Sequence, residues 1–357
     1  MLTSIRIQNF RSIRDASVKL GQVNLFIGPN NSGKSNFLKG ISLIPKNDSP
    51  FDYESSSFRS QDSQTNIDKL GISLSGSYVN KNENIFSDFN YTKPGNYESI
   101  AWAKNNELNE SRNIFWNGEK LIDYSESAYN ISRHQVEPTF HSTKIYNINP
   151  SIIIYSSDIQ RDIEIEGDGK NIVSFLYNLK EGYRQNYNKL EKDFSTCIGE
   201  FIAIGIPRSP VGEGFRLCFF DNNYVRYWAE EVSEGLLYFL ALLCIIHQPN
   251  PPKLLLLEEP EKGIHPRRIK EVVNFIFELA ESRDTQIIFT SHSPYVVDHF
   301  ADIPECVSVF DRKNGETIIR NAADIIEETN SQLNKPIRYS DALGEHWVSG
   351  FLGGVPV

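Results

Sequence analysis

A glycine-rich loop between a predicted strand and a predicted helix constrains the fold of this chain more than any other feature. Residues 28–35 read GPNNSGKS and fit the pattern GxxxxGK[ST]. The preceding VNLFI (23–27) predicts a strand and the following SNFLKGISLI (35–44) a helix, which disfavours a chance glycine-rich turn. In this pattern the backbone N–H groups wrap a phosphate, Lys34 adds a positive charge at the β/γ-phosphates, and the Ser35 hydroxyl can ligate Mg²⁺. The chain is therefore expected to build a strand, loop and helix around a phosphate.

Two adjacent carboxylates follow a run of four leucines further along the chain. Leu254–Leu257 predicts a buried strand, and Glu258 and Glu259 stand where it ends. Taken alone, such a pair more often marks a strand that reaches solvent. A phosphate loop of this kind, however, needs acidic groups on a neighbouring strand to hold Mg²⁺ and to orient the attacking water. We therefore expect Glu258 to serve the metal and Glu259 to act on the water.

Two shorter motifs complete the set. Ser233, Glu234 and Gly235 stand at the start of a predicted helix, where backbone N–H groups favour an anion, although a simple helix cap is the alternative. His292 in TSHSP follows a predicted strand (286–290), where it could contact a γ-phosphate, although a lone histidine is more often structural. The order of the four motifs is a stronger signal than any one of them.

Composition excludes several classes of protein. The 357 residues are 23% charged and 39% hydrophobic with a net charge of −10, which suits a globular chain and argues against a surface that is basic all over. No signal peptide and no run of roughly 20 apolar residues is present, so we expect no membrane span and a cytoplasmic location. Cys218 and Cys244 lie in apolar runs and are predicted to be core residues, and the absence of a CxxC pair disfavours a zinc cluster.

The chain divides by pattern into three parts. Residues 1–44 and 151–321 are predicted to form the core, in which strands alternating with helices favour a mainly parallel sheet. The core includes a helical segment (171–204), and residues 45–150 are predicted to be a polar, β-rich insertion. Residues 322–357 are predicted to be a C-terminal helix and docking tail, or an ordinary packed terminus.

The helical segment and the insertion each present a predicted face. Helical periodicity puts five residues near one face: Phe175, Leu176, Leu179, Tyr183 and Tyr187.

We predict that the insertion carries specificity for a partner or trigger, because a structureless loop of that length would be unusual without a function. Its aromatic residues resemble a contact surface more than a buried nucleus: Tyr91, Tyr97, Trp102, Phe115 and Trp116.

The set of motifs resembles the ABC-type ATPase heads of the SMC, RecF and OLD-nuclease group, and more closely the stand-alone bacterial ATPases of the AAA family type. The stretches that carry the resemblance are IRIQNFRSI, GPNNSGKSN, VSEG, LLLLEEPEKGIHP and TSHSP. They cover about the first 40 residues and residues 225–300, whereas 45–220 match nothing in that group. The resemblance implies an α/β fold: an ABC-type P-loop ATPase head with a mixed, mainly parallel sheet, helices and a β-rich insertion.

The resemblance also implies roles for single residues. The Walker A loop is Gly28, Pro29, Asn30, Asn31, Ser32, Gly33, Lys34, Ser35 and Asn36. The signature motif is Ser233, Glu234 and Gly235. Glu258 is the Walker B acid, which shares the metal with Ser35, and Glu259 is the catalytic glutamate. His292 is the switch histidine, and Arg11 in NFRS reaches a phosphate or a base, or is a surface cation. Many members have Asp where Glu258 stands.

From the resemblance we expect an ATPase that uses ATP and Mg²⁺. In such heads the signature motif of one subunit covers the nucleotide held by another, which implies a homodimer or higher homo-oligomer joined by ATP. The expected role is a nucleotide-driven sensor or clamp, as the ATPase component of a bacterial anti-phage defence system. OLD nucleases append a nuclease domain for which the last 40 residues or so leave no room, so a separate effector, such as a nuclease, is expected. A RecF-like DNA repair ATPase and a non-hydrolysing scaffold are the alternatives, and DNA binding stays open.

Overall fold

The computed structural model divides into two compact units. It describes residues 2–42, 71–80, 83–92, 97–105, 114–116, 121–123, 143–210, 212–262, 264–332 and 342–355. The first unit comprises Met1–Thr143, Lys253–Leu256 and Ile276–Val357. The second comprises Lys144–Pro252 and Leu257–Phe275. The chain therefore passes between the units more than once, and each unit combines segments that are distant in sequence.

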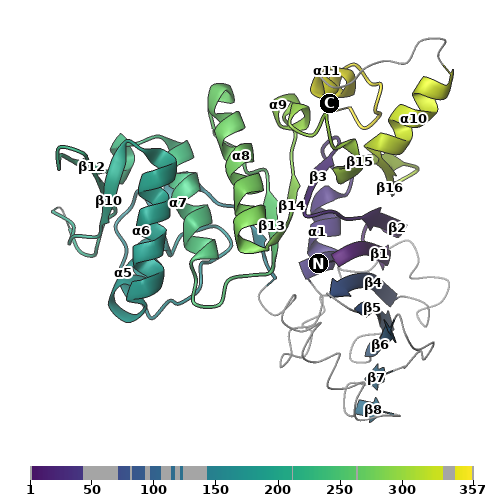
Figure 1. Cartoon of the computed structure of the whole chain (residues 1–357), viewed down its shortest axis with the longest axis horizontal. Helices are drawn as coiled ribbons and strands as arrows, with labels where there is room; N and C mark the ends of the chain where they lie inside the picture. Colours follow the sequence, from purple (N-terminus) through teal and green to yellow (C-terminus); the bar gives the residue numbers. More distant parts are fainter. Residues whose placement is uncertain are drawn as a thin grey trace. The chain divides into compact units, whose positions relative to one another are not determined.

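A mainly parallel sheet forms the centre of the first unit, as the alternation of strands and helices predicts. Its strands run in the order β16-β15-β3-β14-β13 (Figure 1). Their bounds are β3 Val23–Ile27, β13 Leu254–Glu258, β14 Gln286–Thr290, β15 Val307–Lys313 and β16 Glu316–Asn321. β3 pairs parallel with β14 and β15, and β16 turns back antiparallel on β15. Every residue of β3 and β14 is buried, which is typical of central parallel strands covered on both faces.

Aromatic packing fixes the first helix on this sheet. The helices of the first unit are α1 Lys34–Ser42, α9 Pro294–Asp298, α10 Ala322–Gln332 and α11 Leu343–Val348, together with the end of α8 (Pro266–Arg283). The Phe26 ring of β3 lies 5.6 Å from the ring of Phe37 on α1 and 4.9 Å from that of Phe310 on β15.

Across the part of the chain that the structure describes, no helix has the length and apolar character needed to cross a bilayer.

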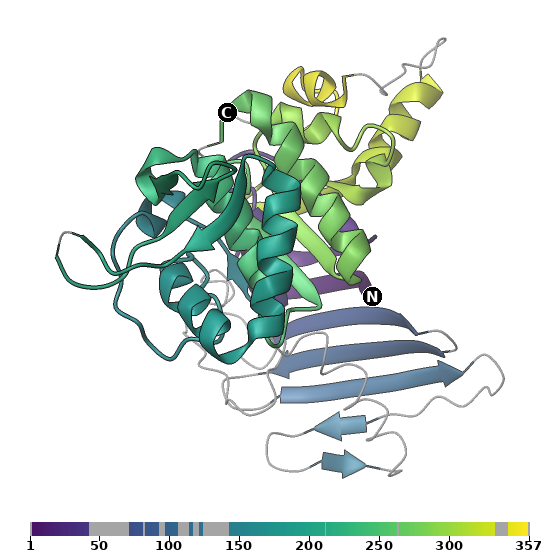
Figure 2. The ribbon, with the colours of Figure 1, turned by 60° about the vertical axis from the view of Figure 1, so that its left-hand side comes forward.

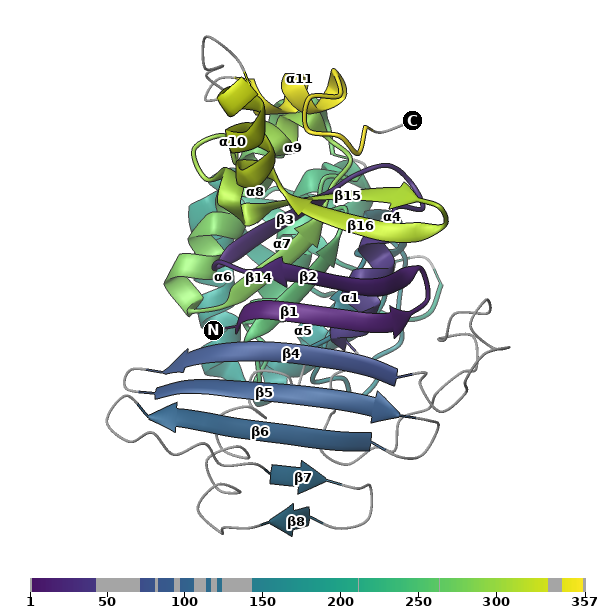
Figure 3. The ribbon, with the colours of Figure 1, turned by 90° about the vertical axis from the view of Figure 1, so that its right-hand side faces the viewer.

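A second, antiparallel sheet also belongs to the first unit (Figures 2 and 3). Its order is β2-β1-β4-β5-β6-β7-β8. The bounds are β1 Leu2–Phe10, β2 Ile13–Lys19, β4 Gly71–Asn80, β5 Glu83–Thr92, β6 Tyr97–Asn105, β7 Ile114–Trp116 and β8 Leu121–Asp123. β4 pairs with β1, so the strands between residues 71 and 123 extend the sheet that the N-terminal hairpin begins. Removal of the insertion would therefore leave one edge of β1 without its partner.

The predicted recognition role of the insertion stays a prediction. The five aromatic residues named above lie on β5, β6 and β7, and their side chains fall outside the described residues, as do residues 43–70 and 124–142.

The second unit packs helices around the long buried helix α7 (Glu234–Ile246). Its other elements are β9 Ile145–Tyr146, α4 Pro150–Ile153, α5 Ile172–Gly182, α6 Arg184–Ile198, β10 Phe201–Gly205, β11 Cys218–Asp221 and β12 Arg226–Trp228. β10, β11 and β12 form an antiparallel sheet, in which β11 and β12 are a hairpin whose turn contains Asp221, Asn222 and Asn223, residue types that favour turns. Cys218 and Cys244 are buried thiols, as expected.

One detail of the helical prediction is wrong. α5 ends at Gly182 and α6 begins at Arg184, so the segment is two helices rather than one. Tyr183 stands between them with a non-helical backbone and is 39% exposed, whereas the periodicity placed it on the buried face. The break shifts the helical phase, and Tyr187 then begins a new buried face.

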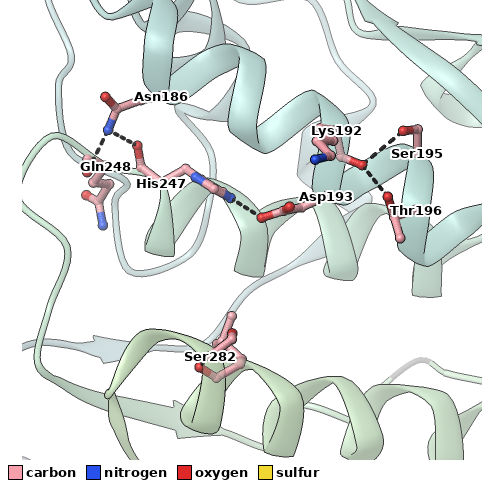
Figure 4. A network of polar contacts seen from close by, with 9 residues as sticks. Asn186, Lys192, Asp193, Ser195, Thr196, His247, Gln248 and Ser282 are labelled. Carbon is pink, nitrogen blue, oxygen red and sulfur yellow. Dashed lines mark hydrogen bonds and ion pairs between the residues drawn. The ribbon is translucent and has the colours of Figure 1, made fainter.

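Side-chain hydrogen bonds join α6 to the C-terminal end of α7 (Figure 4). Asn186 Nδ2 donates to the carbonyl oxygens of His247 at 3.1 Å and Gln248 at 3.4 Å. His247 Nε2 and Asp193 Oδ2 lie 2.8 Å apart. Because the last carbonyls of a helix have no partner within the helix, Asn186 satisfies groups that burial would otherwise leave unpaired.

Asn186→Ala is expected to lower the free energy of unfolding by about 1–2 kcal/mol, since it leaves part-buried carbonyls without a donor. Asn188→Ala is the matched control, because Asn188 is exposed on the same helix and loses the same side chain. Urea denaturation of the two variants measures the difference. Equal midpoints would show that the Asn186 bonds contribute nothing beyond helix propensity.

Candidate functional site

The glycine-rich loop leaves β3 at Gly28 and enters α1 at Lys34. Gly28 has φ +145° and Gly33 φ +108°, values that residues with a Cβ rarely adopt. A Cβ built onto Gly28 would lie 2.1 Å from Phe310 O, and one on Gly33 would lie 2.1 Å from Thr317 Oγ1. The close approach of the neighbouring strands therefore requires glycine at both positions, whether or not a ligand is bound.

Lys34 turns back onto this loop. The residue is 6% exposed, and Nζ donates to the carbonyl oxygens of Gly28 at 2.8 Å and Pro29 at 2.9 Å. The Ser32 hydroxyl is also buried and has no hydrogen-bond partner among the described residues. α1 carries no acidic residue in its first turn. A buried ammonium, an orphaned hydroxyl and a helix N-terminus fit a phosphate group.

His292 follows the strand next to the loop. Phe26 pairs with Thr290 in the parallel β3–β14 ladder, and the Ser291 N–H donates to Phe26 O at 3.0 Å. Gly28 and His292 each come two residues after this pair, so both segments leave the sheet at the same edge. The first unit thus brings the predicted phosphate loop and the predicted switch histidine together.

A polar network joins the β1–β2 turn to the start of α1. Arg11 Nη1 donates to Asn36 Oδ1 at 3.3 Å, and Asn36 Nδ2 donates to Ser12 Oγ at 2.9 Å. Ser12 Oγ lies 2.8 Å from Thr317 Oγ1, on the strand that packs against Gly33. Arg11 is therefore held at the helix that follows the phosphate loop. Sequence reasoning missed Ser12 and Thr317, because only the fold brings them near residue 36.

The second unit contains both predicted carboxylates. Glu258 is the last residue of β13, after four fully buried leucines, and Asn147 Nδ2 donates to Glu258 Oε2 at 3.3 Å. Glu259 has φ +46°, a left-handed conformation that is uncommon for a residue with a side chain. Such strain persists only where the surrounding structure holds it, and it concentrates at functional sites. No sequence pattern marks Asn147, which sequence reasoning missed.

The Ser233 motif also lies in the second unit, at the N-terminus of α7. Ser233 Oγ accepts from the Leu236 N–H at 3.3 Å, which is a helix cap, and from Arg268 Nη1 at 3.1 Å. Ser151 Oγ lies 3.5 Å from Glu234 Oε1. The helix cap, which the sequence offers as the alternative to an anion site, is present, and Arg268 of α8 donates to the same hydroxyl.

Tyr238 links this helix to the loop that follows Glu259. Burial raises the pKa of Tyr238 far above its usual value, and the nearby Glu261 carboxylate raises that pKa further. Tyr238 Oη has no hydrogen-bond partner among the described residues. The phenol therefore stays neutral, and its ionisation is disfavoured by the Glu261 carboxylate of the loop that follows Glu259.

The oxygen donors suit a metal that arrives with a nucleotide. The described residues contain no group of three or more His, Cys, Asp or Glu side chains arranged to hold a metal. Mg²⁺ bound to a nucleotide takes most of its ligands from phosphates and water, and needs one or two from the protein. Ser35 is exposed at the start of α1 in the first unit, and Glu258 is partly exposed at the end of β13 in the second. Each residue offers an oxygen donor of the type that Mg²⁺ takes from proteins.

Comparisons with known proteins identify a family that the chain matches and a relative that it resembles. Residues 23–298 match the sequence model of a family described as "AAA domain, putative AbiEii toxin, Type IV TA system". An OLD nuclease of Thermus scotoductus (strain ATCC 700910 / SA-01) is 21% identical over 329 residues, which are 84% of this chain and 60% of that protein. The chain thus spans less than two thirds of that relative. The predicted resemblance to an OLD-like, ABC-type ATPase head is confirmed.

Solved structures of low identity are also similar. The SMC head domain from Thermotoga maritima has a TM-score of 0.48 at 14% identity, covering 90% of this chain and 98% of that one. The cbiO1 structure from Clostridium perfringens is described as part of the ABC transporter complex cbiONQ. It has a TM-score of 0.41 at 15% identity, and the match covers 92% of this chain and 95% of that one.

Proposed function

Because the chain belongs to the AAA-domain family whose model it matches over residues 23–298, we propose that it binds Mg-ATP in the Gly28–Asn36 loop and hydrolyses it. The observation that carries the proposal is the Lys34 ammonium, buried against the Gly28 and Pro29 carbonyls beside the unpaired Ser32 hydroxyl. A buried lysine ammonium on a glycine-rich loop that leads into a helix N-terminus is suited to a polyphosphate.

Each predicted residue has a proposed task in this reaction. Lys34 exchanges its carbonyl contacts for phosphate oxygens, and the backbone N–H groups of the loop bind the β-phosphate. Ser35 and Glu258 hold Mg²⁺, and Asn147 orients Glu258 through its hydrogen bond. Glu259 takes the proton of the attacking water, and His292 contacts the γ-phosphate. These assignments for Glu258, Glu259 and His292 follow from the family resemblance.

We further propose that two copies act together, with Ser233, Glu234 and Gly235 of one copy covering the nucleotide of the other. The N-terminus of α7 carries partial positive charge, and Arg268 adds a full charge next to the Ser233 hydroxyl. Both features favour an incoming phosphate. ATP would then join two copies and hydrolysis would release them.

The biological role that we propose is a nucleotide-driven sensor or clamp in bacterial defence, acting on a separate effector. The family description names a putative toxin of a type IV toxin–antitoxin system, and the Thermus scotoductus relative is named a nuclease. The chain spans 60% of that relative. We propose that the effector is a separate protein, such as a nuclease. Co-purification from the native host with mass spectrometry would identify that partner, and recovery of repair proteins alone would favour the RecF-like alternative.

Steady-state phosphate release tests the enzymatic proposal. The purified chain should release phosphate from ATP in the presence of Mg²⁺, and EDTA should stop the release, because Ser35 and Glu258 act only through the metal. A protein that binds ATP but releases no phosphate above a buffer control would instead be the non-hydrolysing scaffold.

A further inference from the structure

The C-terminal segment folds back into the first unit beside the phosphate loop. Trp347 on α11 is fully buried, and its Nε1 donates to Gly354 O at 2.8 Å. The Gly350 N–H donates to Trp347 O at 3.0 Å, and the Gly353 N–H donates to Gly350 O at 3.1 Å. These bonds turn the chain after α11 and fix the position of the final glycines, so the segment has a defined path.

That path ends against the first glycine of the phosphate loop. Gly354 has φ +55°. A Cβ built there would lie 2.7 Å from Phe310 O, 2.8 Å from Val309 Cγ1 and 3.6 Å from Gly28 Cα. The same Phe310 carbonyl limits the space at Gly28. Gly354 and Gly28 therefore both pack against the Phe310 carbonyl of β15.

The other end of the segment contacts the helix that follows His292. A Cβ built onto Gly344 of α11 would lie 2.2 Å from Pro294 O, the first residue of α9. The Gly344 N–H donates to Asp298 Oδ1 at 2.8 Å, on the last residue of α9. Pro294 comes two residues after His292 in the chain. One short segment therefore contacts both of the elements that leave the sheet toward the phosphate site.

We propose that residues 343–354, here called the C-terminal strap, position the phosphate loop and the His292 turn relative to each other. The strap acts through its contacts beside Gly28 and at Pro294. A preorganised N–H cradle loses binding energy when its backbone moves, because each lost hydrogen bond to a charged phosphate lowers the affinity by about tenfold or more. This proposal rests on the proposed function, since ATP is the ligand whose affinity the strap sets.

Two neighbouring glycines give a matched test. The two residues have similar backbone conformations, with φ +69° at Gly353 and φ +55° at Gly354. A Cβ added at Gly353 would have no atom within 4 Å, whereas a Cβ added at Gly354 would clash with Phe310 O and Val309 Cγ1. Alanine costs a similar left-handed strain at both positions. Only Gly354→Ala pushes β15 and the strap apart beside Gly28.

The measurement is the Kd of Mg-ATP by calorimetric titration, with the melting temperature of the nucleotide-free protein recorded in parallel. Gly353→Ala should bind ATP as the wild type does, and Gly354→Ala should bind at least about tenfold more weakly while still showing a cooperative melting transition. A purely structural role would lower the melting temperature and leave the Kd of the folded protein unchanged. That second result would overturn the proposal.

Trp347→Phe keeps the proposal testable should Gly354→Ala fail to fold. Phenylalanine retains an aromatic ring in the buried position and lacks the Nε1 donor to Gly354 O. A folded Trp347→Phe protein should also bind ATP more weakly than the wild type, and wild-type affinity would refute the strap. If the wild type itself binds no ATP, the proposed function fails, which is a separate outcome from equal affinities across the variants.

Discussion

Glu259→Gln is expected to lower ATP turnover by about 10² to 10⁴ while ATP affinity stays near that of the wild type, because glutamine cannot accept the proton of the attacking water. Glu259 stands one residue beyond β13 in a left-handed backbone conformation, which the fold maintains against its strain. The substitution conserves size and backbone, so the loss should appear in kcat. Single-turnover phosphate release with a separate equilibrium titration measures the two quantities.

Glu271→Gln is the matched control, since Glu271 is an exposed carboxylate on α8 in the same unit. Its turnover should equal that of the wild type. Unchanged turnover in Glu259→Gln would contradict the assignment of the catalytic glutamate.

The same slow variant tests whether ATP joins two copies. In the Glu259→Gln protein, ATP should accumulate a dimer by light scattering, because hydrolysis no longer separates the subunits. Adding Ser233→Arg should block that dimer while each copy still binds ATP through its own loop. A Ser233→Arg protein that dimerises with ATP would refute a nucleotide shared between subunits.

Lys34→Ala is expected to weaken Mg-ATP binding by about tenfold to a hundredfold, since hydrogen bonds to a charged group contribute about 1.5–3 kcal/mol. The loss arises because Nζ is the buried cation of the loop, held 2.8 Å from Gly28 O and 2.9 Å from Pro29 O. Alanine leaves those two carbonyls without their donor, so a modest decrease in the melting temperature should accompany the loss of affinity.

The sequence predicts best those parts of the fold whose determining residues are close together in the chain. The β3–loop–α1 unit follows from one motif, because strand, glycines and helix are contiguous and the glycines fix the backbone. α7 follows from a Ser233 cap before a long apolar run, and the hairpin of β11 and β12 from its turn residues. In each case the physical determinants lie within about 20 residues of one another.

Contacts between distant segments could not be predicted in this way. Ser12 and Thr317 meet beside Asn36 only because β1, β2 and β16 belong to one unit. Asn147 reaches Glu258, and Arg268 reaches Ser233, across 111 and 35 residues of chain. Polar side chains of this kind have no periodicity, so nothing in the sequence distinguishes them from solvated ones.

The C-terminal glycines illustrate the same limit. The sequence shows a glycine-rich end with one tryptophan, which is compatible with a docking tail or with an ordinary terminus. Only the structure shows that Trp347 fixes Gly354 against Phe310 and the first glycine of the phosphate loop. The effect of adding a side chain at a glycine depends on the atoms that the new side chain would contact. The tertiary fold, and not the local sequence, places those atoms.

Calorimetric titration of Mg-ATP into the wild type, Lys34→Ala and Lys39→Ala tests the central claim most directly. Lys39 is the matched control, because it is an exposed lysine on α1 one turn and a half beyond Lys34. Saturable binding of one ATP per chain is predicted for the wild type and Lys39→Ala, with the affinity of Lys34→Ala reduced by about tenfold or more. Equal affinities for Lys34→Ala and the wild type, or no binding by the wild type, would contradict a nucleotide site in this loop.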